Sequence, residues 1–70
     1  MQRESVQSSM IASLGYDSKT STLEVEFNSG AVWQYSDVPE SVYYDMNNSG
    51  SIGKFFHANI LGQYSESQVG

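Results

Sequence analysis

The most informative absence in this 70-residue chain is cysteine. Without thiols there is no disulfide and no thiol chemistry. Structural zinc sites are built from Cys and His side chains, and His57 is the one such residue in the chain. We therefore predict no metal site and no cofactor. Core packing or self-association must therefore hold the fold together. A chain of this length supports one domain and buries only about 60% of the surface that its unfolded form exposes.

Basic residues are nearly as scarce, with three Lys and Arg against eight Asp and Glu, and the net charge is −5. Nucleic-acid affinity comes largely from basic side chains that neutralise phosphates. Arg3, Lys19 and Lys54 make a poor phosphate footprint. The acidic balance keeps a small protein soluble and can also attract a basic partner.

Long apolar runs are missing as well. Nothing in the sequence approaches the roughly 18 apolar residues that a membrane span needs. No apolar stretch of signal-peptide length follows residues 1–5. Together with the absence of cysteine, this pattern predicts a cytoplasmic location and no membrane partner.

Alternation of polar and apolar residues predicts three strands. The first covers residues 8–16. The second, residues 22–28, alternates most clearly, and it directs Glu24 and Glu26 toward a face that we expect to be solvated. After a short glycine-containing turn, residues 31–35 return as a third strand rich in β-forming residues.

At Asp37 the period changes to that of a helix. Asp37 is expected to cap this helix, with Glu40 three residues later completing a capping box. Residues 47–50 end it. Ser51 is expected to cap a second helix, which ends at Gly62.

The predicted fold class is therefore α+β, a three-stranded antiparallel β-meander followed by two short helices packed on one face. Residues 8–64 form the single domain. Residues 1–7 and 65–70 lack any pattern and are expected to be disordered tails.

Short motifs follow one another in a specific order along this predicted domain. They occupy residues 8–11, 15–17, 23–27, 30, 33–35, 38–39, 42–43, 51–56, 59–60 and 62–64. In order and spacing they resemble the KTSC domain family, named for a C-terminal domain of some lysyl-tRNA synthetases. Trp33-Gln34-Tyr35 stands where that family has a central Tyr-x-Tyr motif.

Many members of that family are small free-standing proteins of bacteria and their phages, so the resemblance implies a bacterial or phage protein, and it suggests RNA binding through the synthetase connection. Members of the family often carry basic residues in the central motif and around the final Ile and Gly. This sequence has Gln34, Asn59, Leu61 and Gln63 at those places. The departure argues against RNA for this member.

Trp33 and Tyr35 are the first candidate binding residues. On an exposed sheet face, two aromatic rings spaced in this way can stack on bases. The alternative is that they form the core against the helices, which we favour because so small a protein needs the volume. Either face of a short strand can be the buried one, so both interpretations stay open.

Lys54, His57 and Asn59 form the second candidate site. Lys54 lies at the start of the second helix, where free N–H groups can hold an anion. Otherwise it is a solvated charge and the neighbouring Gly53 permits close packing. Because the sequence pairs His57 with no nucleophile or acid, we expect it on the surface and predict no catalytic residue.

These observations predict a small, non-enzymatic binding module. The negative net charge favours a protein partner over nucleic acid. The chain would then be a bacterial or phage accessory factor that binds a basic protein or self-associates. The alternative is RNA or other nucleic-acid binding through the face that carries Trp33 and Tyr35. Catalysis is a distant third.

Overall fold

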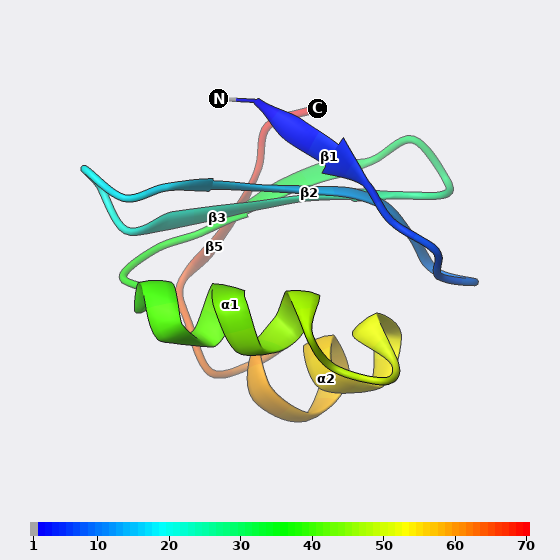
Figure 1. Cartoon of the computed structure of the whole chain (residues 1–70). Helices are drawn as coiled ribbons and strands as arrows, with labels where there is room; N and C mark the ends of the chain where they lie inside the picture. Colours follow the sequence, from blue (N-terminus) through cyan, green and yellow to red (C-terminus); the bar gives the residue numbers. More distant parts are fainter. Residues whose placement is uncertain (1) are drawn as a thin grey trace.

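The computed structural model describes residues 2–70, which form an antiparallel sheet with two helices on one face (Figure 1). The elements in chain order are β1 (Arg3–Ser5), β2 (Ile11–Asp17), β3 (Thr22–Phe27), β4 (Val32–Tyr35), α1 (Glu40–Asn47), α2 (Ile52–Asn59) and β5 (Glu66–Gln68). The strands lie in the sheet in the same order. The α+β class is confirmed, but the described chain has five strands rather than three.

The predicted meander is the middle of this sheet, where β2, β3 and β4 pair antiparallel. A bulge in β2, between Ile11 and Ser13, inserts one extra residue opposite β3. Ile11 and Leu14, three residues apart, are consequently both fully buried on the helix side. The bulge breaks the period-2 pattern that the sequence predicts for this strand.

The core lies between the sheet and the two helices. Its buried apolar residues are Ile11, Leu14, Leu23, Val25, Tyr35, Val38, Met46, Phe56 and Ile60. Phe56 of α2 meets Phe27 and Tyr35 of the sheet edge-on, with ring centroids 5.4 and 5.5 Å apart. Such edge-on pairs stabilise a core beyond the burial of their area, so Phe56 anchors α2 to the sheet.

The prediction of disordered tails is wrong where the structure describes them. Residues 3–5 pair with β2 and residues 66–68 pair with β4, each at an edge of the sheet. Both strands are polar and exposed, so they have no apolar alternation for a sequence pattern to detect. Backbone hydrogen bonds to an existing strand hold them instead. Met1, the first residue of the predicted tail, lies outside the described residues.

Gly15 shows what the pairing of β1 requires of its neighbour. A Cβ atom at this position would lie 2.7 Å from the carbonyl oxygen of Gln2 and 3.0 Å from the Cγ atom of Arg3. Real side chains do not approach backbone that closely. The absence of a side chain at Gly15 therefore permits β1 to lie against β2.

The start of α1 corrects the predicted cap. Asp37 has a φ of 60°, in the left-handed region that Asp tolerates, and α1 begins only at Glu40. Pro39 is the N-cap, and no side chain accepts a hydrogen bond there. The backbone turn at Asp37 lies too far ahead of the helix for a capping box.

The start of α2 agrees with its prediction. Ser51 is the N-cap, and its hydroxyl accepts a hydrogen bond from the Lys54 N–H at 3.4 Å. The helix ends at Asn59, earlier than predicted, and Gly62 follows with a φ of 80° in a turn.

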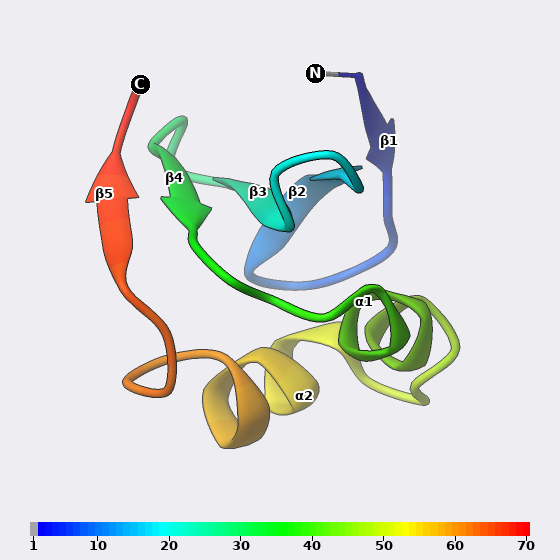
Figure 2. The same ribbon diagram turned by 90° about the vertical axis from the view of Figure 1, so that its left-hand side faces the viewer.

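Figure 2 shows both helices on one side of the sheet and the C-terminus directed to the other. In the described residues, neither helix has the length and apolar character to cross a membrane. The side of the molecule that carries α2 is the one on which the candidate site lies.

Candidate functional site

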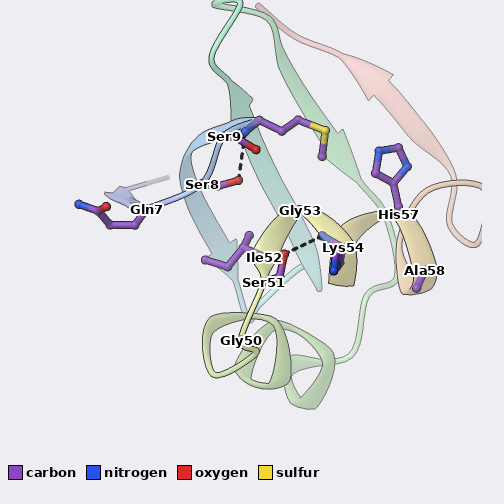
Figure 3. Close-up of a pocket in the computed structure, with 11 residues that line it drawn as sticks. Gln7, Ser8, Ser9, Gly50, Ser51, Ile52, Gly53, Lys54, His57 and Ala58 are labelled. Atoms are coloured by element: carbon purple, nitrogen blue, oxygen red, sulfur yellow. Dashed lines mark hydrogen bonds between the residues drawn. The ribbon is translucent and has the colours of Figure 1, made fainter.

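A hollow of about 650 Å³ opens beside α2, between two segments that are distant in the sequence (Figure 3). One side is formed by residues 7–10, which lead into β2. The other is formed by residues 50–54 together with His57 and Ala58. We call this feature the α2 hollow. It brings together Lys54 and His57, two of the residues singled out in the sequence.

The segment that precedes β2 is held in place by Ser8. Its hydroxyl accepts hydrogen bonds from the backbone N–H groups of Met10 and Ile11, each at 3.2 Å. Its carbonyl accepts one from the side chain of Asn28, and the Asn28 N–H donates to the Met10 carbonyl at 2.9 Å. These bonds make a turn with a defined shape, so this wall of the hollow is preorganised.

The opposite wall is the face of α2 that the core leaves free. Phe56 is 2% exposed and anchors the helix to the sheet. Lys54, His57 and Ala58, at i, i+3 and i+4, share a different face of the helix and are exposed. Burial of Phe56 therefore orients these three residues outward, and Figure 3 shows them beside the hollow.

The floor of the α2 hollow is apolar, whereas its rim is polar. Met10 and Ile52 are half-buried and pack against the core. A Cβ atom at Gly53 would meet the Met10 Cε atom and the Ser8 hydroxyl at 3.6 Å, an ordinary contact distance. The hollow is thus deeper because Gly53 carries no side chain, and it can receive an apolar group while polar atoms surround its mouth.

The hollow also differs from the rest of the protein in charge. Residues 5–16 and 46–65 contain no Asp or Glu, although the chain has eight. The two walls come from these two stretches, and Lys54 is the one formal charge among the described lining residues. In the described part of the chain, the ion pair found is Arg3–Glu24, so the Lys54 ammonium has no acidic partner there.

The first turn of α2 is locally unfavourable for a helix. Gly53 has the weakest helix propensity of any residue but proline. Lys54 places a positive charge at the positive end of the helix dipole, where Asp or Glu is stabilising. Both residues line the α2 hollow. Local rules of stability are broken in this way most often at functional sites.

We expect Gly53→Ala to raise the free energy of unfolding by up to about 1 kcal/mol, because alanine forms helix better than glycine. The new methyl group has room, since its nearest neighbours lie at 3.6 Å. Urea denaturation monitored by far-ultraviolet circular dichroism measures the change. A loss of stability would contradict the contact distances given for this position.

Trp33 and Tyr35 lie away from the hollow and face the core. Tyr35 is 2% exposed, and burial, together with the charge of Glu66, raises the pKa of its phenol to about 12. Trp33 is half-buried against the same cluster. The core interpretation is the one observed, and it leaves the Tyr35 ring no free face on which a base can stack.

Asn59 is exposed at the end of α2, and its side-chain amide donates to the Phe55 carbonyl of its own helix at 3.3 Å. It does not line the α2 hollow. Residues 7–10 were not predicted as part of a site, because residue 7 falls in the predicted tail and residues 8–10 fall in the first predicted strand. The signal that could have found them is the uncharged run around Ser8, which matches the acid-free run around α2.

The opposite face of the sheet carries a polar network centred on Glu24. This carboxylate pairs with Arg3 and accepts a hydrogen bond from Gln34 at 2.9 Å. Arg3 also donates to the Ser13 hydroxyl at 3.1 Å, which in turn donates to Glu26 at 2.8 Å. The expectation that Glu24 is solvated is wrong, since it is 6% exposed. The unpredicted strand β1 carries the Arg3 side chain that covers it.

The pKa of Glu24 follows from its burial and from these partners. Burial alone raises the pKa of the carboxyl, but the hydrogen bonds from Gln34 and Arg3 and the positive charge of Arg3 outweigh it. The net result is a Glu24 pKa below its usual value of 4.5. The carboxylate is therefore charged in the folded protein and held by its partners.

A second, polar hollow of about 490 Å³ lies between β1, the end of β2 and α1. Its aromatic wall is a stacked pair, Tyr16 and Tyr43, with ring centroids 5.1 Å apart. The Tyr16 hydroxyl donates to the Val38 carbonyl at 2.6 Å. These contacts fasten α1 to the sheet, which gives both rings a structural role.

The described residues contain no cluster of side chains suited to bind a metal ion. Among residues 2–70, no group of three or more His, Asp or Glu side chains gathers closely enough to hold a metal ion. No carboxylate is among the described residues that line the α2 hollow with His57. The chemistry that this site supports is recognition of an apolar group flanked by a group that Lys54 and His57 can attract.

Comparison with known proteins agrees on one family. The sequence model of the KTSC domain matches residues 7–64. The crystal structure of a KTSC domain protein from Yersinia pestis superimposes with a TM-score of 0.96 at 36% sequence identity, covering 99% of this chain and 97% of that one.

Curated sequences show the same domain in two settings. An uncharacterised protein of Stutzerimonas stutzeri is 44% identical over 57 residues, which are 81% of this chain and 80% of that protein. A lysine–tRNA ligase of Nostoc punctiforme is 40% identical over 63 residues, which are 90% of this chain. The present chain spans 11% of that ligase, so the similarity concerns one small part of it.

Proposed function

This chain belongs to the KTSC domain family, and we propose that it is a small binding module that holds a segment of a partner protein in the α2 hollow. The observation that carries the proposal is the hollow itself, with its apolar floor, polar rim and one preorganised wall. Sites that bind ligands are typically concave and apolar, with a few polar groups at defined places.

The proposal includes the absence of catalysis by this chain. His57 is exposed on α2, and an acid–base role would need a partner group within hydrogen-bond reach. A bacterial or phage accessory factor acting in the cytoplasm fits a module of this kind. The similarity to part of a lysine–tRNA ligase supports a role beside a larger protein, since a domain of this type also exists within one.

Nucleic-acid binding is the second candidate, and the ligase similarity is the observation that favours it. Burial of Tyr35 counts against base stacking on the Trp33 and Tyr35 pair. Within the α2 hollow, RNA would meet Lys54 and His57. A single formal positive charge beside the hollow is a weak phosphate footprint, so we place the protein partner first.

Site-specific photo-crosslinking in cells that naturally make the protein tests the proposal. A photo-reactive phenylalanine analogue replaces Ala58, which lines the α2 hollow, and in a control replaces Ser41, which is exposed on α1. We expect irradiation to give a discrete adduct from position 58 and none from position 41. The adduct should be destroyed by protease and resist ribonuclease.

Three other results would overturn the proposal. A ribonuclease-sensitive adduct at position 58 would mean that the site contacts RNA. An adduct of twice the protomer mass that contains only this chain would mean self-association. Equal adducts from positions 58 and 41 would mean that the α2 hollow is not the contact surface.

A further inference from the structure

We infer that the segment bound in the α2 hollow carries an acidic residue beside a large apolar one. This inference rests on the proposed function and specifies the chemistry of the partner. Three features support it: the distribution of charge along the chain, the composition of the hollow, and the residues in the first turn of α2.

The charge distribution indicates the sign of the partner. The protein carries a net charge of −5, yet both walls of the α2 hollow come from stretches without Asp or Glu. The eight acidic residues all lie outside these two stretches, so an acidic segment that approaches the parts of the surface that carry them meets like charges, which disfavour contact. At the hollow it meets Lys54, whose charge has no acidic partner among the described residues.

The geometry of the rim indicates how the acidic group is held. Lys54 and His57 are at positions i and i+3 of α2, so their side chains lie on one face of the helix, and both are exposed beside the hollow. A carboxylate between them can accept a hydrogen bond from the ammonium and one from an imidazole N–H. His57 thereby gains a function that does not require catalysis.

The floor indicates the second element of the segment. Met10 and Ile52 offer apolar surface, and Gly53 leaves space above it. A flexible methionine adapts to apolar side chains of different shapes. An aliphatic or aromatic residue next to the acidic one would bury its side chain there while its neighbour remains at the rim.

The first turn of α2 gives the strongest argument that this surface serves binding. Lys54 is the third residue after the Ser51 cap, a position at which Glu completes a capping box. Lysine at this position stabilises the helix less than Glu would, and no ion pair among the described residues compensates for this. The charge at Lys54 is therefore explained by attraction of an acidic partner residue rather than by stabilisation of α2.

Selection from a random heptapeptide library displayed on phage tests the inference. The library is selected in parallel against the wild-type protein, the Lys54→Glu variant and the Lys19→Glu variant. Lys19 is an exposed lysine in the turn between β2 and β3, so its replacement changes the net charge equally but away from the hollow. We expect the wild type and Lys19→Glu to enrich sequences with Asp or Glu within two residues of a large apolar residue.

The most enriched peptide is then synthesised with acetylated and amidated ends and titrated into ¹⁵N-labelled protein. We expect the amide signals of residues 7–10 and 50–58 to shift. Changing the acidic residue of the peptide to its amide should weaken binding roughly three- to fivefold, as for an exposed ion pair. Lys54→Glu should weaken it at least about tenfold, while its melting temperature equals or exceeds that of the wild type because Glu completes the capping box.

The outcomes separate the two proposals. If no enriched peptide shifts the signals of the α2 hollow, the proposed function fails. If peptides bind there but acidic residues are not enriched, or if Lys54→Glu binds as tightly as the wild type, only the present inference fails. Equal weakening by Lys54→Glu and Lys19→Glu would also refute it, since net charge alone would then explain the preference.

Discussion

Phe56→Ala is expected to lower the free energy of unfolding by about 3–5 kcal/mol, the range for truncating a buried phenylalanine. Phe56 is 2% exposed, and its ring meets both Phe27 and Tyr35 edge-on. Truncation leaves a cavity and removes the anchor that joins α2 to the sheet. A 70-residue domain without disulfides has only about 4–10 kcal/mol in total, so the variant should be largely unfolded at 37 °C.

Urea denaturation monitored by Trp33 fluorescence and by circular dichroism measures this loss. Tyr44→Ala is the matched control, because Tyr44 is also an aromatic residue of the helical layer but is 67% exposed. We expect the control to change stability by less than about 0.5 kcal/mol. If Phe56→Ala unfolds at the wild-type urea concentration, α2 is not anchored by this residue, and the orientation of its outer face needs another explanation.

The sequence predicts well those elements whose stability is local or depends on burial of one face. The alternation in β3 is clear because Leu23 and Val25 are fully buried while their neighbours point to the other face. The Ser51 cap is recognisable because it bonds to an amide three residues away. In both cases the partners are near in sequence or share a simple period.

The features that escaped prediction depend on distant contacts. β1 exists because Gly15 admits its backbone and Glu24 binds Arg3, 21 residues away. The bulge that buries both Ile11 and Leu14 is set by pairing with β3 rather than by the pattern of β2. Propensity and periodicity contain no information about such pairings.

The candidate site divides along the same line. Lys54 and His57 could be singled out because they are rare residue types in this chain, which has two lysines and one histidine. The wall formed by residues 7–10 was not singled out, because the tertiary structure rather than a local pattern places it beside α2. The orientation of Trp33 and Tyr35 was open for a similar reason, since a four-residue strand does not reveal which face the helices will cover.

Arg3→Gln is expected to lower the free energy of unfolding at pH 7 by about 1–3 kcal/mol, the range for leaving a buried hydrogen-bonded group without its partner. Glu24 remains buried in the variant, and of its two side-chain partners only Gln34 is left. Its pKa must therefore rise relative to the wild type, because burial is the largest influence on it and raises it. Nuclear magnetic resonance of the Glu24 carboxyl carbon measures the pKa in each protein.

The pH dependence of stability gives the sign of this effect. In the wild type the Glu24 pKa lies below its usual 4.5, so the carboxylate contributes stability that is present above that value and is lost as the pH falls through the folded-state pKa. The difference in stability between wild type and Arg3→Gln should consequently be largest near neutral pH and shrink toward low pH. Urea denaturation at a series of pH values measures it.

A double-mutant cycle distinguishes this network from a general role of Arg3. Glu24→Gln removes the buried charge, so Arg3→Gln should be less destabilising in that background than in the wild type. Glu4→Gln, on the same strand but exposed, is the control and should change stability little at any pH. Additive effects of the Arg3 and Glu24 replacements, with a difference that does not vary with pH, would show that β1 is held by its backbone hydrogen bonds alone. The polar face of the sheet would then owe its burial to the strand rather than to the ion pair.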